Sequence, residues 1–153
     1  MNLDPVRSIA ALSSRWRNRF SRSKESLPEH LRRGARGEKL AARFLRTRGY
    51  KVLYRNFKAR GGGEIDIVCR EGETLVFVEV KTRSGDEFGR PIEAVGREKE
   101  MRISKGGLAW LRLLDNPDVS FRFDVVEVLL GEEGEPRCEL IQDAFELSQP
   151  YIY

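Results

Sequence analysis

A short hairpin signal restricts the fold of this chain more than any other feature of its sequence. In the stretch EIDIVCREGETLVFVEV, two apolar runs flank Glu71-Gly72-Glu73-Thr74, with glycine at the first central position. This is the pattern of a two-residue type II′ turn. The turn pairs residue 71 with residue 74, so paired residue numbers sum to 145. Since side chains alternate between the two faces of a strand, the turn predicts which residues share a face.

The predicted register gives the hairpin one apolar face and one face that changes character along its length. The apolar face consists of three cross-strand pairs: Ile65 with Val80, Ile67 with Val78 and Cys69 with Val76. The second face is apolar near the turn, with Val68 opposite Phe77. It ends in charges, with Asp66 opposite Glu79 and Glu64 opposite Lys81. We expect this face to form a wedge between the sheet and a helix, with the charged end at its mouth.

The pair Asp66 and Glu79 is the informative one. Directly opposed residues have Cβ atoms about 5 Å apart, and like charges at such positions are destabilising. At an effective dielectric near 20, two carboxylates about 5 Å apart repel by roughly 3 kcal/mol. A divalent cation would offset this repulsion, and oxygen-only ligands suit Mg²⁺ or Mn²⁺. Two alternatives remain open: one carboxylate holds a proton, or the charges form a solvated salt-bridge cluster at the sheet edge.

The remaining segments predict an α/β sandwich with a mixed sheet, in the order αβββαβ. A helix is expected over residues 31–48, ended by Gly49. The other expected segments are strands at 51–57, 63–70 and 74–82, a helix at 93–114, a strand over FRFDVVEVLL, a further short strand, and a terminal helical turn around DAFEL.

Glu38 stands out because it lies within the apolar stripe of the first expected helix. A carboxylate near the start of a helix is favourable to the helix dipole, which is one explanation. Its position among the apolar residues that face the sheet indicates a role in the charged site instead.

Composition limits the function classes. The 153 residues suit one soluble domain, with no apolar run long enough for a membrane span or a secretory signal. Cys69 and Cys138 form no CxxC motif, and a reduced, cytoplasmic protein is expected. With His30 as its one histidine, the chain offers neither a zinc site nor a histidine-based catalytic triad. Its glycine run, residues 61–63, lacks the lysine of a phosphate-binding loop.

Charge is unevenly distributed, and it indicates a polyanionic partner. Residues 1–33 hold 8 basic and 3 acidic residues, residues 34–112 hold 18 and 11, and residues 113–153 hold 2 and 10. We expect an N-terminal extension over residues 1–30, a folded domain over 31–147 and a tail over 148–153. The extension is interpreted either as a basic amphipathic helix for a membrane or partner, or as a partly disordered arm.

Taken together, these motifs are similar to those of a known family. GEIDIV followed by LVFVEVKTR resembles the D…ExK signature of restriction-endonuclease-like nucleases, written PD-(D/E)xK, although Ile65-Asp66 stands where the signature has Pro-Asp. With GARGEKLAARFLRTRGY, NFKARGGGEIDIV, FGRPIEAV, KEMRI, RFDVVEV and DAF, residues 31–145 resemble the YraN-type family of small bacterial proteins. The resemblance implies a restriction-endonuclease-like three-layer sandwich, similar to that of archaeal Holliday-junction resolvases.

The resemblance also implies roles for individual residues. Asp66, Glu79 and Glu38 correspond to metal-binding carboxylates, and Lys81 to the lysine that acts on the attacking water. Glu64 and Lys99 match family positions that support the site. Independently of the resemblance, four basic residues that follow the site could contact phosphates or simply be solvated at the surface: Arg83, Arg97, Arg102 and Lys105.

The expected function is a Mg²⁺- or Mn²⁺-dependent endonuclease acting on DNA. The carboxylate pair and Lys81 point to phosphodiester hydrolysis. A branched substrate follows from the resemblance alone, and a homodimer is a possibility that the two-fold symmetry of four-way junctions raises. The rival hypothesis is a nucleic-acid-binding module that keeps the fold without catalysis.

Overall fold

The computed structural model describes residues 27–85, 95–131 and 134–151. Within these ranges the elements are α2 (Glu29–Thr47), β1 (Lys51–Lys58), β2 (Glu64–Glu71), β3 (Thr74–Ser84), α3 (Arg97–Leu113), β4 (Phe121–Leu130) and β5 (Arg137–Phe145). The prediction of a mixed α/β fold is confirmed. The predicted N-terminal extension lies almost wholly outside the described residues, as do the first two residues of the helix expected at 93–114.

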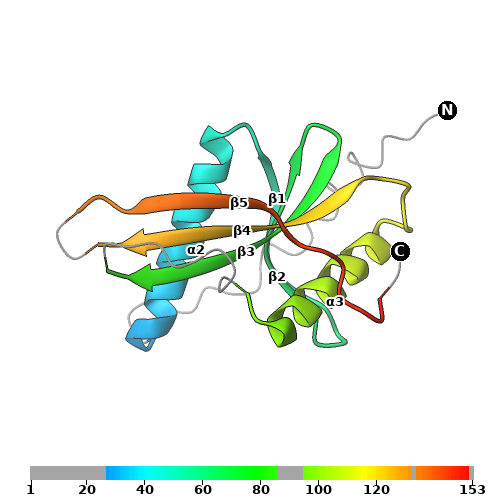
Figure 1. Cartoon of the computed structure of the whole chain (residues 1–153), viewed down its shortest axis with the longest axis horizontal. Helices are drawn as coiled ribbons and strands as arrows, with labels where there is room; N and C mark the ends of the chain where they lie inside the picture. The colour runs from blue at the N-terminus through cyan, green and yellow to red at the C-terminus, as the bar shows by residue number, and fades with distance from the viewer. Residues whose placement is uncertain (1–26, 86–94, 132–133, 152–153) are drawn as a thin grey trace.

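The described strands form one mixed sheet in the order β1-β2-β3-β4-β5. Strands β3 and β4 run parallel, and the other neighbouring strands run antiparallel. Helix α3 lies in the connection between the two parallel strands, which cannot be joined by a tight turn. In Figure 1, α2 crosses behind β3, β4 and β5, whereas α3 lies near the lower end of β2.

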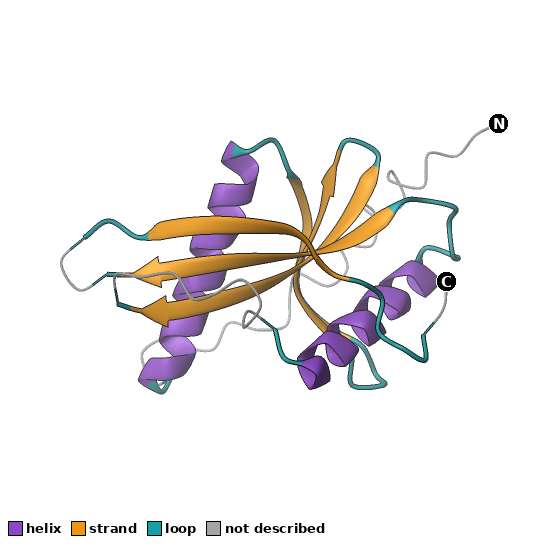
Figure 2. Cartoon of the chain, viewed as in Figure 1, coloured by secondary structure: helices purple, strands orange, loops and turns teal. Residues whose placement is uncertain are grey.

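Each helix covers one face of the sheet, because the strands alternate apolar side chains between both faces. On the α2 side, Ala42 and Leu45 pack with Val78 and Val126 of the strands. On the α3 side lies a second buried cluster, which consists of Ile65, Val68, Leu75, Phe77, Ile103, Leu108, Trp110, Leu111 and Phe123. The resulting layers, helix, sheet and helix, can be followed in Figure 2.

Two glycines bring the helices unusually close to the strands. A Cβ atom at Gly37 of α2 would lie 1.8 Å from Oγ1 of Thr82 on β3. A Cβ atom at Gly106 of α3 would lie 2.9 Å from Cγ1 of Ile65 on β2. The close approach at Gly37 brings this part of α2 near the sheet, where Glu38, the next residue, is half-buried.

The expected helical turn around DAFEL is wrong, because β5 continues to Phe145. The β4–β5 register shifts between Phe123 and Val125, and Asp143 adopts a positive φ of 51°. This irregularity returns Phe145 to pairing with Phe123, and their rings stack at 5.0 Å between centroids. The buried aromatic contact therefore favours extended chain over a helical turn.

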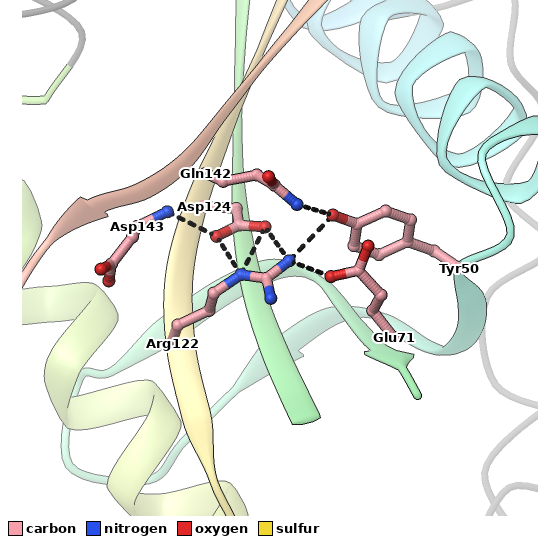
Figure 3. A network of polar contacts seen from close by, with 6 residues as sticks. All are labelled: Tyr50, Glu71, Arg122, Asp124, Gln142 and Asp143. Carbon is pink, nitrogen blue, oxygen red and sulfur yellow. Dashed lines mark hydrogen bonds and ion pairs between the residues drawn. The ribbon is translucent and has the colours of Figure 1, made fainter. Parts of the chain in front are cut away.

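A buried polar network holds the sheet together at the end that carries the hairpin turn (Figure 3). Asp124 is fully buried and accepts hydrogen bonds from Nε of Arg122 and from the backbone amide of Asp143, both at 2.9 Å. The Arg122 guanidinium also donates to Glu71 at 2.6 Å and to the Tyr50 hydroxyl at 2.8 Å. Arg122 thus joins β4 to the end of β2 and to the residue before β1, Asp124 links the network to β5, and the charge of the arginine balances that of the buried Asp124.

Two expectations from composition concern cysteines and membrane spans. Cys69 is buried and Cys138 is half-buried, and both are free thiols. Among the described helices, neither has the length and apolarity that crossing a membrane requires.

Candidate active site

The charged end of the hairpin lies where β2 and β3 separate. The predicted register is confirmed from Glu71–Thr74 to Ile67–Val78, where the pairing of these strands stops. Beyond this point β2 remains paired with β1, and β3 with β4. We call this divergence the fork.

The fork changes two details of the expected hairpin. Asp66 and Glu79 are not a ladder pair, because the strands have already separated. Instead, Oδ2 of Asp66 accepts a hydrogen bond from the backbone amide of Val80 at 2.8 Å. Ile65 packs with the α3 cluster, although alternation from Ile67 placed it on the α2 side. The close approach of α3 accounts for this contact, since a Cβ atom at Gly106 would lie 2.9 Å from Cγ1 of Ile65.

Glu79 is the carboxylate of the site with the least favourable environment for a negative charge. Its side chain is 12% exposed, and its Oε2 is buried without a hydrogen-bond partner. Burial, followed by the negative charge of Asp66, raises the pKa of Glu79 to about 8. The two carboxylates are therefore close enough to interact, as the sequence predicted, and a proton on Glu79 relieves their repulsion.

Lys99 and Glu64 complete the side of the fork that faces α3. Nζ of Lys99 lies 2.6 Å from Oε1 of Glu64 and 3.3 Å from Oε1 of Glu79. Burial acts to lower the pKa of Lys99, but its hydrogen bond to Glu64 and the charges of Glu79 and Asp66 outweigh burial and raise it. The same hydrogen bond lowers the pKa of Glu64.

The position of Lys99 follows from the docking of α3. Gly106 lies seven residues later, two helical turns along the same face. It approaches the backbone of Glu64 so closely that a Cβ atom would lie 3.0 Å from it. Because the glycine lets the helix contact β2 directly, the lysine two turns earlier reaches the carboxylates at the fork.

Glu38 approaches the fork from the α2 side. Burial raises the pKa of Glu38, and the nearby charge of Asp66 raises it further, whereas a hydrogen bond with Asn56 lowers it. Its Oε2 also lies 3.9 Å from Nη2 of Arg55. Glu38 is thus held beside the site by residues of β1 and lies within electrostatic range of Asp66.

The three carboxylates expected to bind metal do not form one cluster among the described residues. Across residues 27–85, 95–131 and 134–151, no three acidic, histidine or cysteine side chains form a set that would hold a metal ion. Asp66 and Glu79 are the pair that a divalent cation would meet at the fork. This suffices for Mg²⁺, which is commonly held by one or two carboxylates together with water and substrate phosphate.

Lys81 and Arg83 lie on the same face of β3 as Glu79, because they follow it by two and four residues along the strand. In the parallel register of β3 and β4, Lys81 is aligned with Glu127. Nε of Arg83 lies 3.4 Å from Oε1 of that glutamate. Glu127 is fully buried, and its Oε2 has no hydrogen-bond partner among the described residues. The sequence analysis missed Glu127, although a carboxylate inside the apolar strand FRFDVVEVLL is the same signal that identified Asp66.

The other predicted phosphate contacts lie along α3 and differ in how available they are. Arg97 is exposed at the start of the helix. Arg102 forms an exposed ion pair with Glu98 at 3.0 Å, and its charge helps to lower the pKa of Glu64. Nζ of Lys105 donates to the carbonyl oxygen of Gly61 at 3.0 Å. Among these three residues, Arg102 is therefore the one whose charge acts on Glu64 at the fork.

Comparison with known proteins identifies relatives over most of the chain. A sequence model described as "Uncharacterised protein family UPF0102" matches residues 37–128. A UPF0102 protein of Syntrophus aciditrophicus (strain SB) is 49% identical over 122 residues, which cover 80% of this chain and 94% of the relative. One from Geobacter sulfurreducens is 50% identical over 115 residues, 75% of this chain and 89% of the relative. One from Rhodococcus opacus (strain B4) is 43% identical over 119 residues, 78% of this chain and all of the relative.

Proposed function

The chain belongs to the uncharacterised protein family UPF0102, whose name assigns no activity, and we propose its function from the site itself. The proposal is a Mg²⁺- or Mn²⁺-dependent endonuclease that hydrolyses phosphodiester bonds in DNA. Its fold is proposed to be restriction-endonuclease-like, supported by the mixed sheet between two helices and the carboxylates at the fork. Branched DNA as the substrate, and a homodimer that matches its symmetry, belong to the same proposal.

The single observation that carries the proposal is the buried, unpartnered Oε2 of Glu79 beside Asp66. A buried carboxylate oxygen without a partner costs about 1–3 kcal/mol or more. A second carboxylate nearby adds to this cost through repulsion. A divalent cation would satisfy the free oxygen and both charges at once, in place of the proton that Glu79 holds.

Each protein group has a role that its contacts support. A bound cation would polarise a phosphoryl oxygen and lower the pKa of bound water. Asp66 is oriented by its hydrogen bond from the amide of Val80, which holds its Oδ2 at the fork beside Glu79. Lys81, on the face of Glu79, supplies a positive charge to the phosphate as negative charge develops on it.

Lys99 and Arg83 are assigned positioning roles. Lys99 neutralises Glu64 and part of the charge of Glu79, which keeps two further negative charges from repelling the DNA backbone. Arg83 is held by Glu127, and a guanidinium in this position suits a phosphate next to the scissile one.

One observation favours the second candidate, a nucleic-acid-binding module without catalysis. Nζ of Lys99 lies 3.3 Å from Glu79, so an ammonium group already stands where a cation would approach this carboxylate. If Lys99 keeps that position, the site would attract phosphate without binding a metal.

Cleavage assays separate the two candidates. Synthetic four-way junctions, flaps, duplexes and single strands are incubated with Mn²⁺ or Mg²⁺, with the wild-type protein beside Asp66→Ala and Lys81→Ala. Cation-dependent cutting that both substitutions abolish supports the endonuclease. Binding without cutting, unchanged by either substitution, supports the binding module.

A further inference from the structure

The outer surface of α2 carries a continuous row of positive charge. Its members recur at alternating intervals of four and three residues, so they lie one above another on one side of the helix. We call this row the α2 stripe; it consists of Arg32, Arg36, Lys39, Arg43 and Arg46, all exposed. Over 14 residues at about 1.5 Å per residue, it extends for roughly 21 Å.

The stripe is not neutralised by the acidic residues of its own helix. Glu29 pairs with Arg33, outside the stripe, at 3.0 Å. Glu38 lies against β1 near Arg55. In the part of the chain that the structure describes, none of the ion pairs includes a stripe residue. Like charges three and four residues apart destabilise a helix, so the stripe favours association with a polyanion.

Duplex DNA fits the stripe better than a membrane does. The apolar side of α2 is occupied, since Ala41, Ala42 and Leu45 are fully buried against the sheet. An interfacial helix must insert an apolar face into the lipid, whereas the apolar face of α2 packs against the sheet and leaves Leu31 as its exposed large apolar residue. Duplex DNA carries one negative charge per about 1.7 Å of its axis, or about twelve charges over the length of the stripe.

A single strand is also a poorer match. Proteins that bind single strands combine positive charge with exposed aromatic rings on which bases stack. The stripe consists of basic residues alone. The aromatic ring of α2, Phe44, is half-buried and lies under the guanidinium of Arg48 at 4.6 Å.

Basic residues connect the stripe to the fork. Glu38, which faces the site, is followed directly by Lys39 of the stripe. Arg55 lies 3.9 Å from Glu38, and the charge of Lys58 acts on both Glu38 and Glu64. A polyanion on the stripe would therefore pass beside the mouth of the site.

We propose that the α2 stripe binds the phosphate backbone of duplex DNA that flanks the cleavage site. The inference rests on the proposed function for the role of the fork, but the binding itself does not require cleavage. It implies that the substrate has a double-stranded arm extending beyond the reacting phosphate.

The test is the salt dependence of binding, measured by fluorescence anisotropy with EDTA so that no cutting occurs. The probes are a 30-bp duplex and a single strand of about the same length, each over a series of salt concentrations. The variant is Arg36→Gln/Arg43→Gln, since glutamine has a helix propensity close to that of arginine. The control Arg112→Gln/Arg137→Gln removes the same charge from exposed positions on α3 and β5.

The slope of log K against log salt is negative, and for the duplex its magnitude should decrease by about 1.8 in the stripe variant. This is about 0.9 for each of the two phosphate contacts removed. The control should change the slope by much less, and circular dichroism should show equal helix content in all three proteins. An unchanged slope, an equal change in the control, or a greater loss for the single strand would overturn the proposal.

Cleavage assays keep this proposal distinct from the proposed function. If duplex binding depends on the stripe but the protein never cuts DNA, the endonuclease proposal is wrong and the duplex-binding surface is supported. If the protein cuts DNA and the stripe substitutions change neither cutting nor binding, the endonuclease proposal is supported and the duplex-binding surface is wrong.

Discussion

Asp66 accepts a hydrogen bond from the backbone amide of Val80 across the fork between β2 and β3, at 2.8 Å. The side chain thus takes the position of a ladder partner that the separating strands no longer supply. This contact orients the carboxylate beside Glu79 and makes the separation of the strands part of the site.

Asp66→Asn should abolish cleavage while preserving the fold. The asparagine carbonyl oxygen still accepts from the amide of Val80, but the negative charge that a cation needs is lost. Cleavage should fall by more than about 100-fold, since even an outer partner of a metal ligand is worth about 10- to 100-fold. Asp118→Asn, at an exposed loop position, is the control in single-turnover assays. Undiminished cutting by Asp66→Asn would remove Asp66 from the site.

The metal-free protein should lose stability as pH rises from about 4.5 to about 8. The pKa of Glu79 is raised to about 8 by burial and then by Asp66, so the folded state holds a proton that the unfolded state releases near the ordinary pKa of 4.5. The stabilisation is complete below the unfolded pKa and is lost as pH rises through the folded pKa. The expected loss is on the order of a few kcal/mol, measured by urea unfolding in EDTA.

Two comparisons isolate Glu79 in this experiment. Glu79→Gln should flatten the fall in unfolding free energy relative to the wild type. Mg²⁺ or Mn²⁺ should raise the melting temperature of the wild type more at pH 8 than at pH 5, because the cation competes with the proton. Equal pH profiles for the wild type and Glu79→Gln would contradict the assignment.

Gly37→Ala should destabilise the protein, whereas Gly34→Ala on the same helix should not. The Cβ atom at Gly37 would meet Oγ1 and Cβ of Thr82 at 1.8 and 2.9 Å, whereas nothing lies within 4 Å of the one at Gly34. The expected loss at Gly37 is about 1–3 kcal/mol from overpacking. Gly34→Ala should gain up to about 1 kcal/mol from helix propensity. Thermal unfolding of both variants tests the close approach of α2 to β3, and equal melting temperatures would argue against it.

Arg122→Ala should be the most destabilising charge removal described here. It leaves the fully buried Asp124 without the guanidinium that donates to it at 2.9 Å. Breaking a buried pair in this way costs about 3–5 kcal/mol. The control Arg102→Ala removes an exposed ion pair with Glu98 and should cost about 1 kcal/mol or less. Similar unfolding midpoints in urea for both variants would show that Arg122 is not the central residue of the network.

Local patterns in the chain were enough to predict the elements and most of the hairpin. The turn at Gly72 sets the register from Glu71–Thr74 to Ile67–Val78, because a two-residue turn leaves only one pairing of the residues that follow it. The same patterns pointed to Asp66 and Glu79, since charges within apolar strands are conspicuous. The α2 stripe is also visible in the sequence, because its members recur at helical spacing.

The contacts that make the site depend on segments far apart in the chain, and the fold alone sets them. The fork arises because β2 stays with β1 while β3 stays with β4, and no pattern within the hairpin predicts where two partners will pull apart. Lys99 reaches Glu64 and Glu79 because α3 docks at Gly106. Short-range turn geometry and side-chain alternation can be read along a chain, whereas the burial that raises the pKa of Glu79 exists only once helices have packed on both faces of the sheet.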